Sequence, residues 1–575
     1  MTLADLKKQG EAPEFLTAEA FDTLSKGYLL AGETPKDAYK RVSRSVAKHL
    51  KKPELEKKFF DYIWKNWLCL ASPVVSNCGS ERGLPISCFG QSVNDSLSDI
   101  FMSYHESAML SKYGGGIGKY WGDVRGRGEV ITGNGFSEGV IPWLKNEDTN
   151  ISSVSQGGVR RGASANYLPI WHPDADEFLD VRRQTGDDSR RCRSTQFHHG
   201  LVVSDDFMKK VETGDPGARK LWSKTLKTRT EMGEPYLMFS DNANNQAPQW
   251  YKDKGLTIKT SQLCNEIFLF NDKDHTFVCC LSSLNLARYD EWKDSDLVQT
   301  SIWFLDGVME EFISKAKTIK GFEKAVRFSE KSRALGLGVL GWHTLLQNKN
   351  IPFDSFDAMM LNKEIFSKMQ TRSLEATKDL ALEYGEPEWC KGYGIRNTHC
   401  LAVAPTMSNA LISGGVSQGV EPIVANVYAQ KTAKGTYLRK NPALDALLTS
   451  KNMNNLDVWN KINSDRGSVK NLDFLSAEEK DTFKTAREIN QFAIIRQAAQ
   501  RQRFIDQGQS INLFFTVPEN INDSETKKKL GKYIHQVHFE AWQSGLKGLY
   551  YLRNESPLRG DAIYQDSSDC KACEG

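Results

Sequence analysis

The chain has 575 residues, of which 39% are hydrophobic and 26% are charged, as is typical of a soluble globular protein. Its 75 basic and 72 acidic residues leave a net charge of +3, too small to create a field that attracts nucleic acid. No apolar run approaches the roughly 20 residues that a membrane span needs, and the polar N-terminus is unlike a signal peptide. We therefore predict a cytoplasmic protein that binds neither nucleic acid nor membrane.

Eleven cysteines are spread over the chain, an odd number in a sequence without signs of secretion. A framework of structural disulfides is therefore not expected. We interpret the cysteines as reduced thiols, some of which have redox or catalytic roles.

Residues 1–70 are predicted to be helical. Thr34 can cap a helix that has Pro35 at its first position, and apolar residues recur at helical spacing from Ala38 to Leu50. A second helix is predicted from Leu55 to about Leu68. This region offers no chemistry and is expected to pack on a larger body.

After this region, short apolar runs are broken by glycines and small polar residues. Cys88 lies in a short buried-strand pattern, and a helix is predicted from Asp95 to about Lys112. The glycines from Gly114 to Gly118 are interpreted as a turn whose amides approach a phosphate, with Arg125 as an anion-binding side chain. An ordinary turn between a strand and a helix explains the same glycines.

Strands then alternate with helices over several hundred residues. One strand ends at Trp171 before a helix capped near Asp174, and Leu201–Val203 precede a helix capped by Ser204. This alternation predicts an α/β body with ligands at the ends of its strands.

The segment around Cys264 most strongly suggests catalysis. If residues 262–266 are extended, Gln262, Cys264 and Glu266 project to one side, because side chains alternate along a strand. A buried carboxylate and a buried amide need polar partners, so this is unusual company for a cysteine that only fills a core. Burial as a packing residue is the other interpretation of this cysteine.

The C-terminal half adds a turn, an aromatic pair and two cysteines. Pro405–Asn409 follow an apolar strand at a helix start, where amides and hydroxyls can bind an anion or simply cap the helix. Tyr550 and Tyr551 lie in a strand-like run, where packing is the simpler local interpretation. Cys570 and Cys573 form a C-x-x-C in a small polar tail that offers no further zinc ligands, which favours a redox dithiol.

In their order and spacing, these motifs resemble the large, catalytic α subunit of class I ribonucleotide reductase, from about residue 71 to the C-terminus. The matching motifs are Ser87-Cys88, Asp95-Ser96-Leu97, the Gln156–Ala163 turn, Leu263-Cys264 with Glu266, Cys279 in CCLSSLNL, PTMSNA with Glu421-Pro422, Tyr550-Tyr551 and the tail dithiol. The resemblance implies a ten-stranded α/β barrel closed around a finger loop that carries a radical cysteine. We expect a helical region at 1–70, the barrel at 71–560 and a mobile redox-active tail at 561–575.

The resemblance also implies how the substrate is held and attacked. Cys264 is the thiyl radical site that removes hydrogen from C3′ of the ribose, and Glu266 takes the 3′-hydroxyl proton. Gln262 stands where the family usually has an asparagine that hydrogen-bonds the substrate, and it is one methylene longer. Further substrate contacts are implied for Ser72, Ser87, Pro405, Thr406, Met407, Ser408 and Asn409.

Two cysteine pairs are implied to carry the reducing equivalents. Cys88 and Cys279 reduce the substrate and finish as a disulfide, whereas the neighbouring Cys280 is interpreted as a packing residue. Cys570 and Cys573 then reduce that disulfide by exchange and are themselves reduced by thioredoxin or glutaredoxin.

Partners and effectors follow from the same resemblance. Tyr550 and Tyr551 pass the radical inward from a separate metal-containing β subunit, entering at Tyr551, and stacking of these neighbours requires a bend in the strand. No cofactor or metal is expected in this chain itself. A deoxynucleoside triphosphate or ATP effector is implied at the interface of a homodimer, bound by Asp95, Ser96, Leu97 and Arg125. Residues 190–196 correspond to the loop that links effector to substrate.

Three hypotheses remain open from the sequence. The first is a class I reductase acting on ribonucleoside diphosphates, with triphosphates left possible by Met407 in the phosphate loop. The second is the adenosylcobalamin-dependent reductase, which needs no tyrosine pair, and the third is a nucleotide-binding paralogue without catalysis. The chain also starts without the ATP-cone of many α subunits, so we predict no inhibition of overall activity by dATP.

Overall fold

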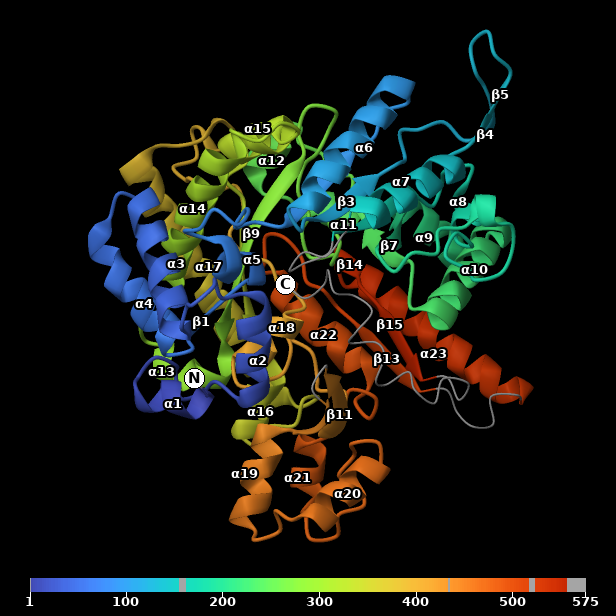
Figure 1. The fold of residues 1–575 in the computed structure, drawn as a ribbon. Helices are drawn as coiled ribbons and strands as arrows, with labels where there is room; N and C mark the ends of the chain where they lie inside the picture. Colours follow the sequence, from blue (N-terminus) through green and yellow to red (C-terminus); the bar gives the residue numbers. More distant parts are fainter. Residues whose placement is uncertain (1, 155–161, 433–434, 517–522, 556–575) are drawn as a thin grey trace.

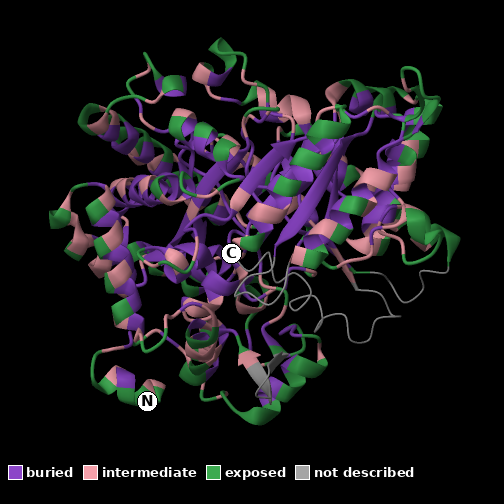
Figure 2. Ribbon diagram, turned by 45° about the horizontal axis from the view of Figure 1, so that its top comes forward, coloured by how far each residue is buried: buried purple, intermediate pink, exposed green. Residues whose placement is uncertain are grey.

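The structure is a computed structural model that describes residues 2–154, 162–432, 435–516 and 523–555. Helices surround a central group of strands (Figure 1), and these strands are the most fully buried part of the chain (Figure 2). No helix within the described ranges has both the length and the apolar character needed to cross a membrane.

The first half of the central sheet consists of parallel strands in the order β2, β3, β6, β7, β8. Their bounds are β2 (Cys88–Ser92), β3 (Gly116–Tyr120), β6 (Ala163–Pro169), β7 (Phe197–Val203) and β8 (Tyr236–Phe239). Every residue of β3, β6, β7 and β8 is buried, because helices cover the outer face and a loop fills the inner one.

The second half is also parallel. β9 (Phe277–Asn285) pairs with β10 (Leu335–Leu340), and Leu337 is bridged to Leu401. Val403 is bridged in turn to Gln509, which precedes β13 (Leu513–Thr516), and β13 pairs with β15 (Leu552–Glu555).

The two halves close into a ring because they meet at both edges in antiparallel fashion. β2 pairs with β9, and β8 pairs with β14 (Gly548–Leu549), which leads into β15. Five segments in each half therefore form the predicted ten-stranded α/β barrel, and this prediction is confirmed. One segment, residues 401–403, is joined to its neighbours by isolated bridges and single hydrogen bonds rather than by a continuous ladder.

The N-terminal helices agree with the sequence in one case and differ in another. α3 (Pro35–His49) begins where predicted, with Thr34 and Asp37 forming a capping box. α4 (Glu56–Trp64) ends before the predicted Leu68, because Asn66 adopts the left-handed conformation with a φ of 60°. The chain then enters β1 (Leu68–Leu70), which pairs with β9.

Ser204 caps α9 (Asp205–Thr213), as predicted. α6 (Leu97–Lys112) ends at the predicted residue, and the structure shows that Ser96 caps its start. The other long helices that cover the barrel are α7 (Ile141–Val154), α10 (Pro216–Met232), α14 (Leu297–Ala316), α15 (Glu323–Ser332), α17 (Phe356–Tyr384), α22 (Gln491–Gln502) and α23 (Ser524–Gln543).

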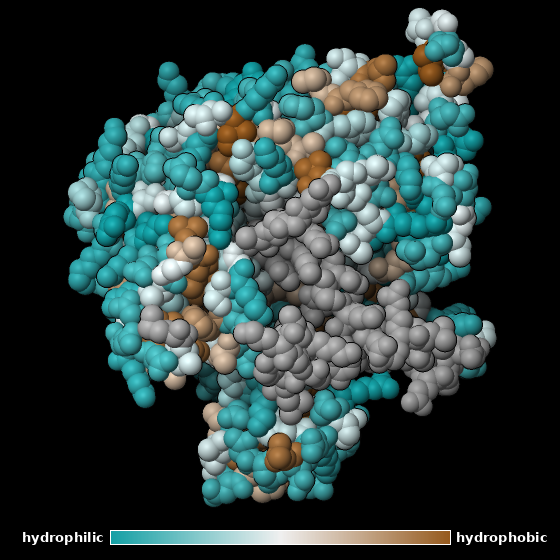
Figure 3. All heavy atoms as spheres, viewed as in Figure 1, coloured by the Kyte–Doolittle hydropathy of each residue, from teal (hydrophilic) through white to brown (hydrophobic). Residues whose placement is uncertain are grey.

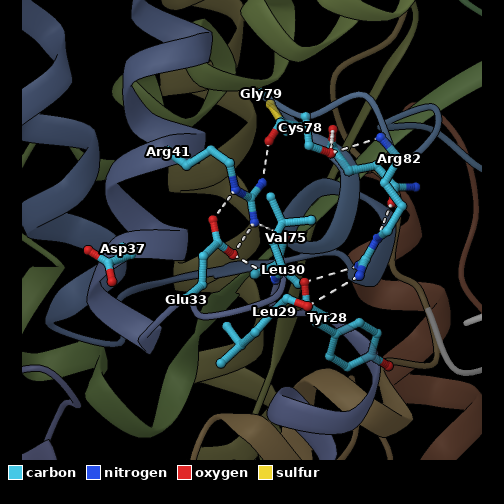
Figure 4. Close-up of polar contacts among 12 residues, drawn as sticks. Tyr28, Leu29, Leu30, Glu33, Asp37, Arg41, Val75, Cys78, Gly79 and Arg82 are labelled. Atoms are coloured by element: carbon cyan, nitrogen blue, oxygen red, sulfur yellow. Dashed lines mark hydrogen bonds and ion pairs between the residues drawn. The ribbon is translucent and has the colours of Figure 1, made fainter.

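Two arginines fasten the N-terminal helices to the segment that follows β1 (Figure 4). Arg41 of α3 binds both carboxylate oxygens of Glu33 and donates to the backbone oxygens of Val75 and Cys78, at the end of α5 (Ser72–Asn77). Arg82 donates to the backbone oxygens of residues 27–29. The helical region therefore fixes the position of α5, whose first residue is a predicted substrate contact.

A small helical unit with its own hydrophobic core protrudes at the bottom of Figure 1. It contains β11 (Val427–Thr432), β12 (Gly435–Lys440), α19 (Pro442–Ser450), α20 (Leu456–Ser464) and α21 (Ala477–Thr482). Trp459, Leu444 and Ile462 are fully buried in this second core, which is separate from the core of the barrel.

Candidate active site

The loop between β8 and β9 folds back on itself as a finger inside the barrel. A bridge between Ser261 and Phe268 closes its two arms. Its tip contacts both halves of the barrel: the Tyr167 hydroxyl donates to the Gln262 backbone oxygen at 2.9 Å, and the Gly508 amide donates to the Glu266 backbone oxygen at 2.8 Å. The finger is thus held from opposite sides.

The finger tip is a tight turn and not the extended stretch expected from the sequence. The Asn265 amide bonds the Gln262 backbone oxygen, and Asn265 has a φ of 62°. The side-chain oxygen of Gln262 accepts hydrogen bonds from the amides of Glu266 and Ile267, at 3.2 and 3.1 Å. Gln262 therefore braces the turn that presents Cys264, and a hydrogen bond from its side chain lowers the pKa of Glu266.

The glycines near residue 116 make room for the finger. Gly116 and Gly118 lie within β3, not in the predicted phosphate-binding turn. A Cβ atom at Gly118 would lie 1.8 Å from the Ser261 backbone oxygen, and one at Gly116 would lie 3.0 Å from the Leu263 side chain. The interpretation of these two glycines as a phosphate turn is therefore wrong, because Gly118 leaves room for the finger backbone and Gly116 leaves room for the Leu263 side chain.

The finger, β2 and β9 bring three predicted sulfurs and the predicted carboxylate to one cavity. The cavity is lined by Ala71, Pro73, Pro85, Ile86, Ser87, Cys88, Cys264, Glu266, Cys279, Leu281 and Pro405. Cys88 and Cys279 are direct partners in the antiparallel pairing of β2 with β9, so their side chains leave the sheet side by side on the same face. Neither is in a disulfide.

The carboxyl group of Glu266 is buried and acts in a dry environment. Ser510 donates to its Oε2 at 2.9 Å, but burial is the stronger influence and raises the pKa of Glu266 to about 7. Burial also holds the pKa of the Cys279 thiol well above its usual range, against a hydrogen bond of 3.2 Å from Gln507. At neutral pH the Cys279 thiol is therefore protonated, and about half of the Glu266 carboxyl is protonated, whereas an exposed carboxyl would be ionised.

Tyr550 and Tyr551 lie beside the finger at a break between β14 and β15. Their ring centroids are 4.3 Å apart with an interplanar angle of 53°. The Tyr551 amide bonds the side chain of Asn512 and not a neighbouring strand, and this break in the strand lets the two rings meet, although they are tilted and not stacked as expected. Burial raises the pKa of Tyr550 well above its usual range, and the adjacent Cys264 thiol contributes to this shift.

The predicted phosphate loop adjoins the same cavity, which Pro405 lines. Thr406, with a φ of 55°, precedes α18 (Met407–Ile412), and its hydroxyl accepts a hydrogen bond from the Gly419 amide at 2.8 Å. Ser408 and Asn409 are buried in the first turn of this helix. Ser72 begins α5 between two cavity-lining residues and hydrogen-bonds the Tyr28 hydroxyl at 3.3 Å.

The predicted effector residues form a second group at the N-terminus of α6. Arg125 binds the Asp95 carboxylate at 2.7 Å, beside the cap residue Ser96 and the exposed Leu97.

Some predicted site residues lie outside the described residues. They are most of the Gln156–Ala163 turn and the cysteines at 570 and 573. In the part of the chain that the structure describes, no cluster of His, Cys, Asp and Glu could hold a metal ion.

Three further residues support the site without any signal in the sequence. Tyr167 holds the finger, Ser510 binds Glu266, and Gln507 binds Cys279. Each is distant in sequence from the group that it contacts, so no local motif could have indicated it.

Comparisons with known proteins cover nearly the whole chain. The family model for the ribonucleotide reductase barrel domain matches residues 86–217, 215–392 and 387–552, and the model for the ribonucleotide reductase all-alpha domain matches residues 14–83. A Frog virus 3 (isolate Goorha) protein, named provisionally as a ribonucleoside-diphosphate reductase large subunit, is 40% identical over 97% of this chain and 99% of its own length.

Two further relatives extend the comparison. The ribonucleoside-diphosphate reductase large subunit of Invertebrate iridescent virus 3 is 33% identical over 91% of this chain and 92% of its own length. The solved structure of the Actinobacillus ureae class Id ribonucleotide reductase alpha subunit is 41% identical, with a TM-score of 0.86 over 94% of this chain and 98% of that one.

Proposed function

The chain belongs to the ribonucleotide reductase family as a class I large subunit that reduces ribonucleoside diphosphates, and from this premise we propose which of its residues carry the reaction. The observation that supports the assignment best is the meeting of Cys88, Cys264, Glu266 and Cys279 at one cavity. A pure nucleotide-binding protein has no use for three thiols around a buried carboxyl group.

Reduction starts at the finger tip. The Cys264 thiyl radical takes the hydrogen atom from C3′ of the ribose, and Glu266 accepts the 3′-hydroxyl proton. The carboxylate can act as this base for two reasons. The radical at C3′ acidifies the hydroxyl, and the pKa of about 7 makes Glu266 a stronger base than an ordinary carboxylate. Ser510 orients the carboxylate towards the cavity.

The paired cysteines supply two electrons and two protons. One thiol protonates the departing 2′-hydroxyl, which leaves as water, and the two sulfurs finish joined as a disulfide while C2′ gains hydrogen. C3′ then recovers a hydrogen atom from the Cys264 thiol, which restores the thiyl radical. The direct pairing of Cys88 with Cys279 across β2 and β9 supports this role, since a disulfide needs Cβ atoms about 4 Å apart.

A class I large subunit receives its radical from a separate β subunit. We assign Tyr551 and Tyr550 as the route inward to Cys264, with the radical entering at Tyr551. The contact of the two rings, and the interaction of Tyr550 with the Cys264 thiol, support this order. The metal of the radical source belongs to that β subunit.

Substrate and effector occupy different regions of the chain. The nucleotide diphosphate is proposed to bind to Ser72, Ser87 and the loop from Pro405 to Asn409, with Gln262 of the finger as a further contact. A nucleoside triphosphate effector is proposed to bind at the N-terminus of α6, to Asp95, Ser96, Leu97 and Arg125.

The effector region is also the proposed dimer face. Exposed apolar side chains occur on α6 and on the hairpin formed by β4 (Arg127–Val130) and β5 (Phe136–Glu138), where brown spheres project at the upper right of Figure 3. They are Leu97, Phe101, Met102, Val130 and Phe136.

The tail cysteines at 570 and 573 are proposed to reduce the disulfide of Cys88 and Cys279 after each turnover. Thioredoxin or glutaredoxin is proposed as the reductant of these tail cysteines.

The test of this function is reduction of CDP by the purified chain mixed with its cognate β subunit and a dithiol. Formation of dCDP that depends on both subunits is expected. Formation of dCDP with adenosylcobalamin and no β subunit would instead favour the cobalamin-dependent class.

A further inference from the structure

The side chain of Gln507 contacts the sulfur of Cys279, one of the two cysteines that are proposed to form a disulfide in each turnover. Gln507 is fully buried, and its backbone amide donates to the Leu401 backbone oxygen at 3.2 Å. Its side-chain Nε2 lies 2.7 Å from the backbone oxygen of Leu335, the first residue of β10, and 3.2 Å from Sγ of Cys279. The backbone therefore holds the side-chain amide at a fixed place beside the sulfur.

The Leu335 carbonyl determines which way the Gln507 side-chain amide faces. A carbonyl oxygen can only accept a hydrogen bond, so the Gln507 atom that faces it is the nitrogen and not Oε1. This nitrogen carries two hydrogens, and it has two acceptors, the Leu335 oxygen and the Cys279 sulfur. Each acceptor therefore receives its own hydrogen, and the sulfur is the acceptor in its contact with Gln507.

The two sulfurs of the pair differ in how easily they can be reached. β10 passes close to Cys279, because a Cβ atom at Gly336 would lie 3.1 Å from its Sγ. Cys279 is 1% exposed, whereas Cys88 is partly exposed at the same cavity. A reagent that enters the cavity therefore meets the Cys88 sulfur more readily than the Cys279 sulfur.

The contact with Gln507 favours negative charge on Cys279. Burial raises the pKa of this thiol well above its usual range, and the neighbouring Cys280, Glu266 and Asp506 raise it further. The hydrogen bond from Gln507 lowers the pKa, because an N–H donor stabilises a thiolate more than a thiol. In thiol–disulfide exchange, a sulfur that is better stabilised as a thiolate leaves faster.

We propose that Gln507 makes Cys279 the leaving sulfur when the disulfide is reduced, so that the incoming thiolate attacks Cys88. This inference rests on the proposed disulfide of Cys88 and Cys279. The incoming thiolate forms a bond to Sγ of Cys88, the bond between the two cysteine sulfurs breaks, and its electron pair remains on Sγ of Cys279. The Cys279 thiolate then takes a proton from water. A second thiolate attacks the incoming sulfur and releases Cys88, and the dithiol that supplied both thiolates is oxidised to its own disulfide.

The experiment uses the full chain with Cys570→Ser and Cys573→Ser, so that only an added thiol can reduce the disulfide. One turnover with CDP, effector and the β subunit forms the disulfide, and the monothiol mercaptoethanol is then added. The reaction is stopped with acid before the first mixed disulfide can rearrange, and free thiols are alkylated. Peptide mass spectrometry measures the mercaptoethanol adducts at Cys88 and Cys279 and the rate at which the disulfide opens.

Two variants remove the hydrogen bond to Cys279 in different ways. Gln507→Met keeps the length of the side chain without a donor. Gln507→Glu keeps its shape, and the single hydrogen of a protonated carboxyl goes to the Leu335 oxygen, which is a stronger acceptor than sulfur. Gln509→Glu is the matched control, because the side-chain amide of Gln509 is also buried and bonds residues of α22.

With Gln507 in place, we expect at least about ten times more adduct at Cys88 than at Cys279. Both variants at position 507 should open the disulfide about tenfold more slowly and lower that ratio, because only attack at Cys88 depends on a stable Cys279 thiolate. Gln509→Glu should change neither the rate nor the ratio. More adduct at Cys279 than at Cys88, or an unchanged ratio in both Gln507 variants, would overturn the inference.

Failure of this inference is distinguishable from failure of the proposed function. If turnover forms no disulfide, the proposed pair is refuted and the inference with it. A disulfide that forms and is then opened by attack at Cys279 refutes the inference alone. The chain with Gln507 intact gives this site of attack without depending on how well the variants fold.

Discussion

Cys88 of β2 and Cys279 of β9 face each other directly across the antiparallel seam that joins the two halves of the barrel. From this pairing we predict that one turnover without external reductant joins them in a disulfide. Mass spectrometry of the alkylated, digested protein after incubation with CDP, effector and β subunit would detect the linked peptides. Cys279→Ala should prevent both the linkage and repeated turnover.

Cys280 offers the matched control for that experiment. Neighbouring residues in a strand point to opposite faces, so the Cys280 thiol leaves the sheet away from Cys88. Cys280→Ala should still form the linkage and should retain turnover with a dithiol. A loss of turnover as large as that of Cys279→Ala would contradict the assignment of the pair.

Cys264→Ser is predicted to bind CDP and effector normally and to lose turnover by at least about 1,000-fold, which corresponds to about 4 kcal/mol in the barrier. An alcohol O–H bond is much harder to convert into a radical than a thiol S–H bond, while the change in shape is small. Binding is measured by equilibrium dialysis and turnover by dCDP formation. Normal turnover would remove Cys264 from the radical pathway.

The raised pKa of Glu266 predicts that kcat/KM falls on the acid side of about pH 7. As a base the group must be ionised, so kcat/KM should rise about tenfold per unit up to pH 7 and level off above it. With the ordinary pKa of 4.5, the rate would instead be level from about pH 5.5 upwards. Initial rates of CDP reduction between pH 5.5 and 8.5 distinguish the two cases.

Glu421 is the necessary control for this profile, because burial also raises its pKa to about 7. If the acid-side fall in rate persists in the residual activity of Glu421→Gln, it belongs to Glu266.

The same two groups make the stability of the protein depend on pH. Each has a pKa in the folded state that lies above its value in the unfolded state, so between about pH 4.5 and 7 the unfolding free energy decreases as pH rises. Glu266→Gln should flatten part of that dependence in chemical unfolding.

Gly118→Ala is predicted to disable the finger. The added methyl group would collide with the backbone of Ser261 and Gln262, so the finger must move. We expect a loss of about 1–3 kcal/mol in unfolding free energy and a fall in kcat of about 100-fold, as for a displacement of about 1 Å at a reacting group.

Gly531→Ala provides the comparison for that variant. Gly531 lies in α23 with open space around it, so alanine should leave kcat unchanged and raise the unfolding free energy by up to about 1 kcal/mol. Equal kinetics in the two alanine variants would show that the close approach at β3 does not position Cys264.

Local signals in the sequence predicted much of the structure. The helix starts at Thr34 and Ser204 depend on a side chain and an amide three residues away, so they can be seen in the sequence. The alternation of strands and helices likewise indicated an α/β body, and the family resemblance supplied the closed barrel.

Pairings between distant residues could not be predicted in this way. The register that sets Cys88 opposite Cys279 joins strands 191 positions apart in numbering, and it is fixed by packing of the whole ring. The turn at Asn265 exists because Tyr167 and Gly508 grip the finger from both halves. The glycines of β3 fit a phosphate-binding turn when the sequence is considered locally. Only the fold shows that Gly116 and Gly118 instead make room for the finger.

The unit from β11 to α21 has consequences for how this protein can change over time. Its buried tryptophan, leucines and phenylalanine pack on one another and not on the barrel. We therefore expect substitutions within this second core to leave the chemistry of deoxyribose formation undisturbed. Natural variation in length should therefore accumulate in this appendage, where new attachments to other molecules can arise while the reaction chamber stays constant.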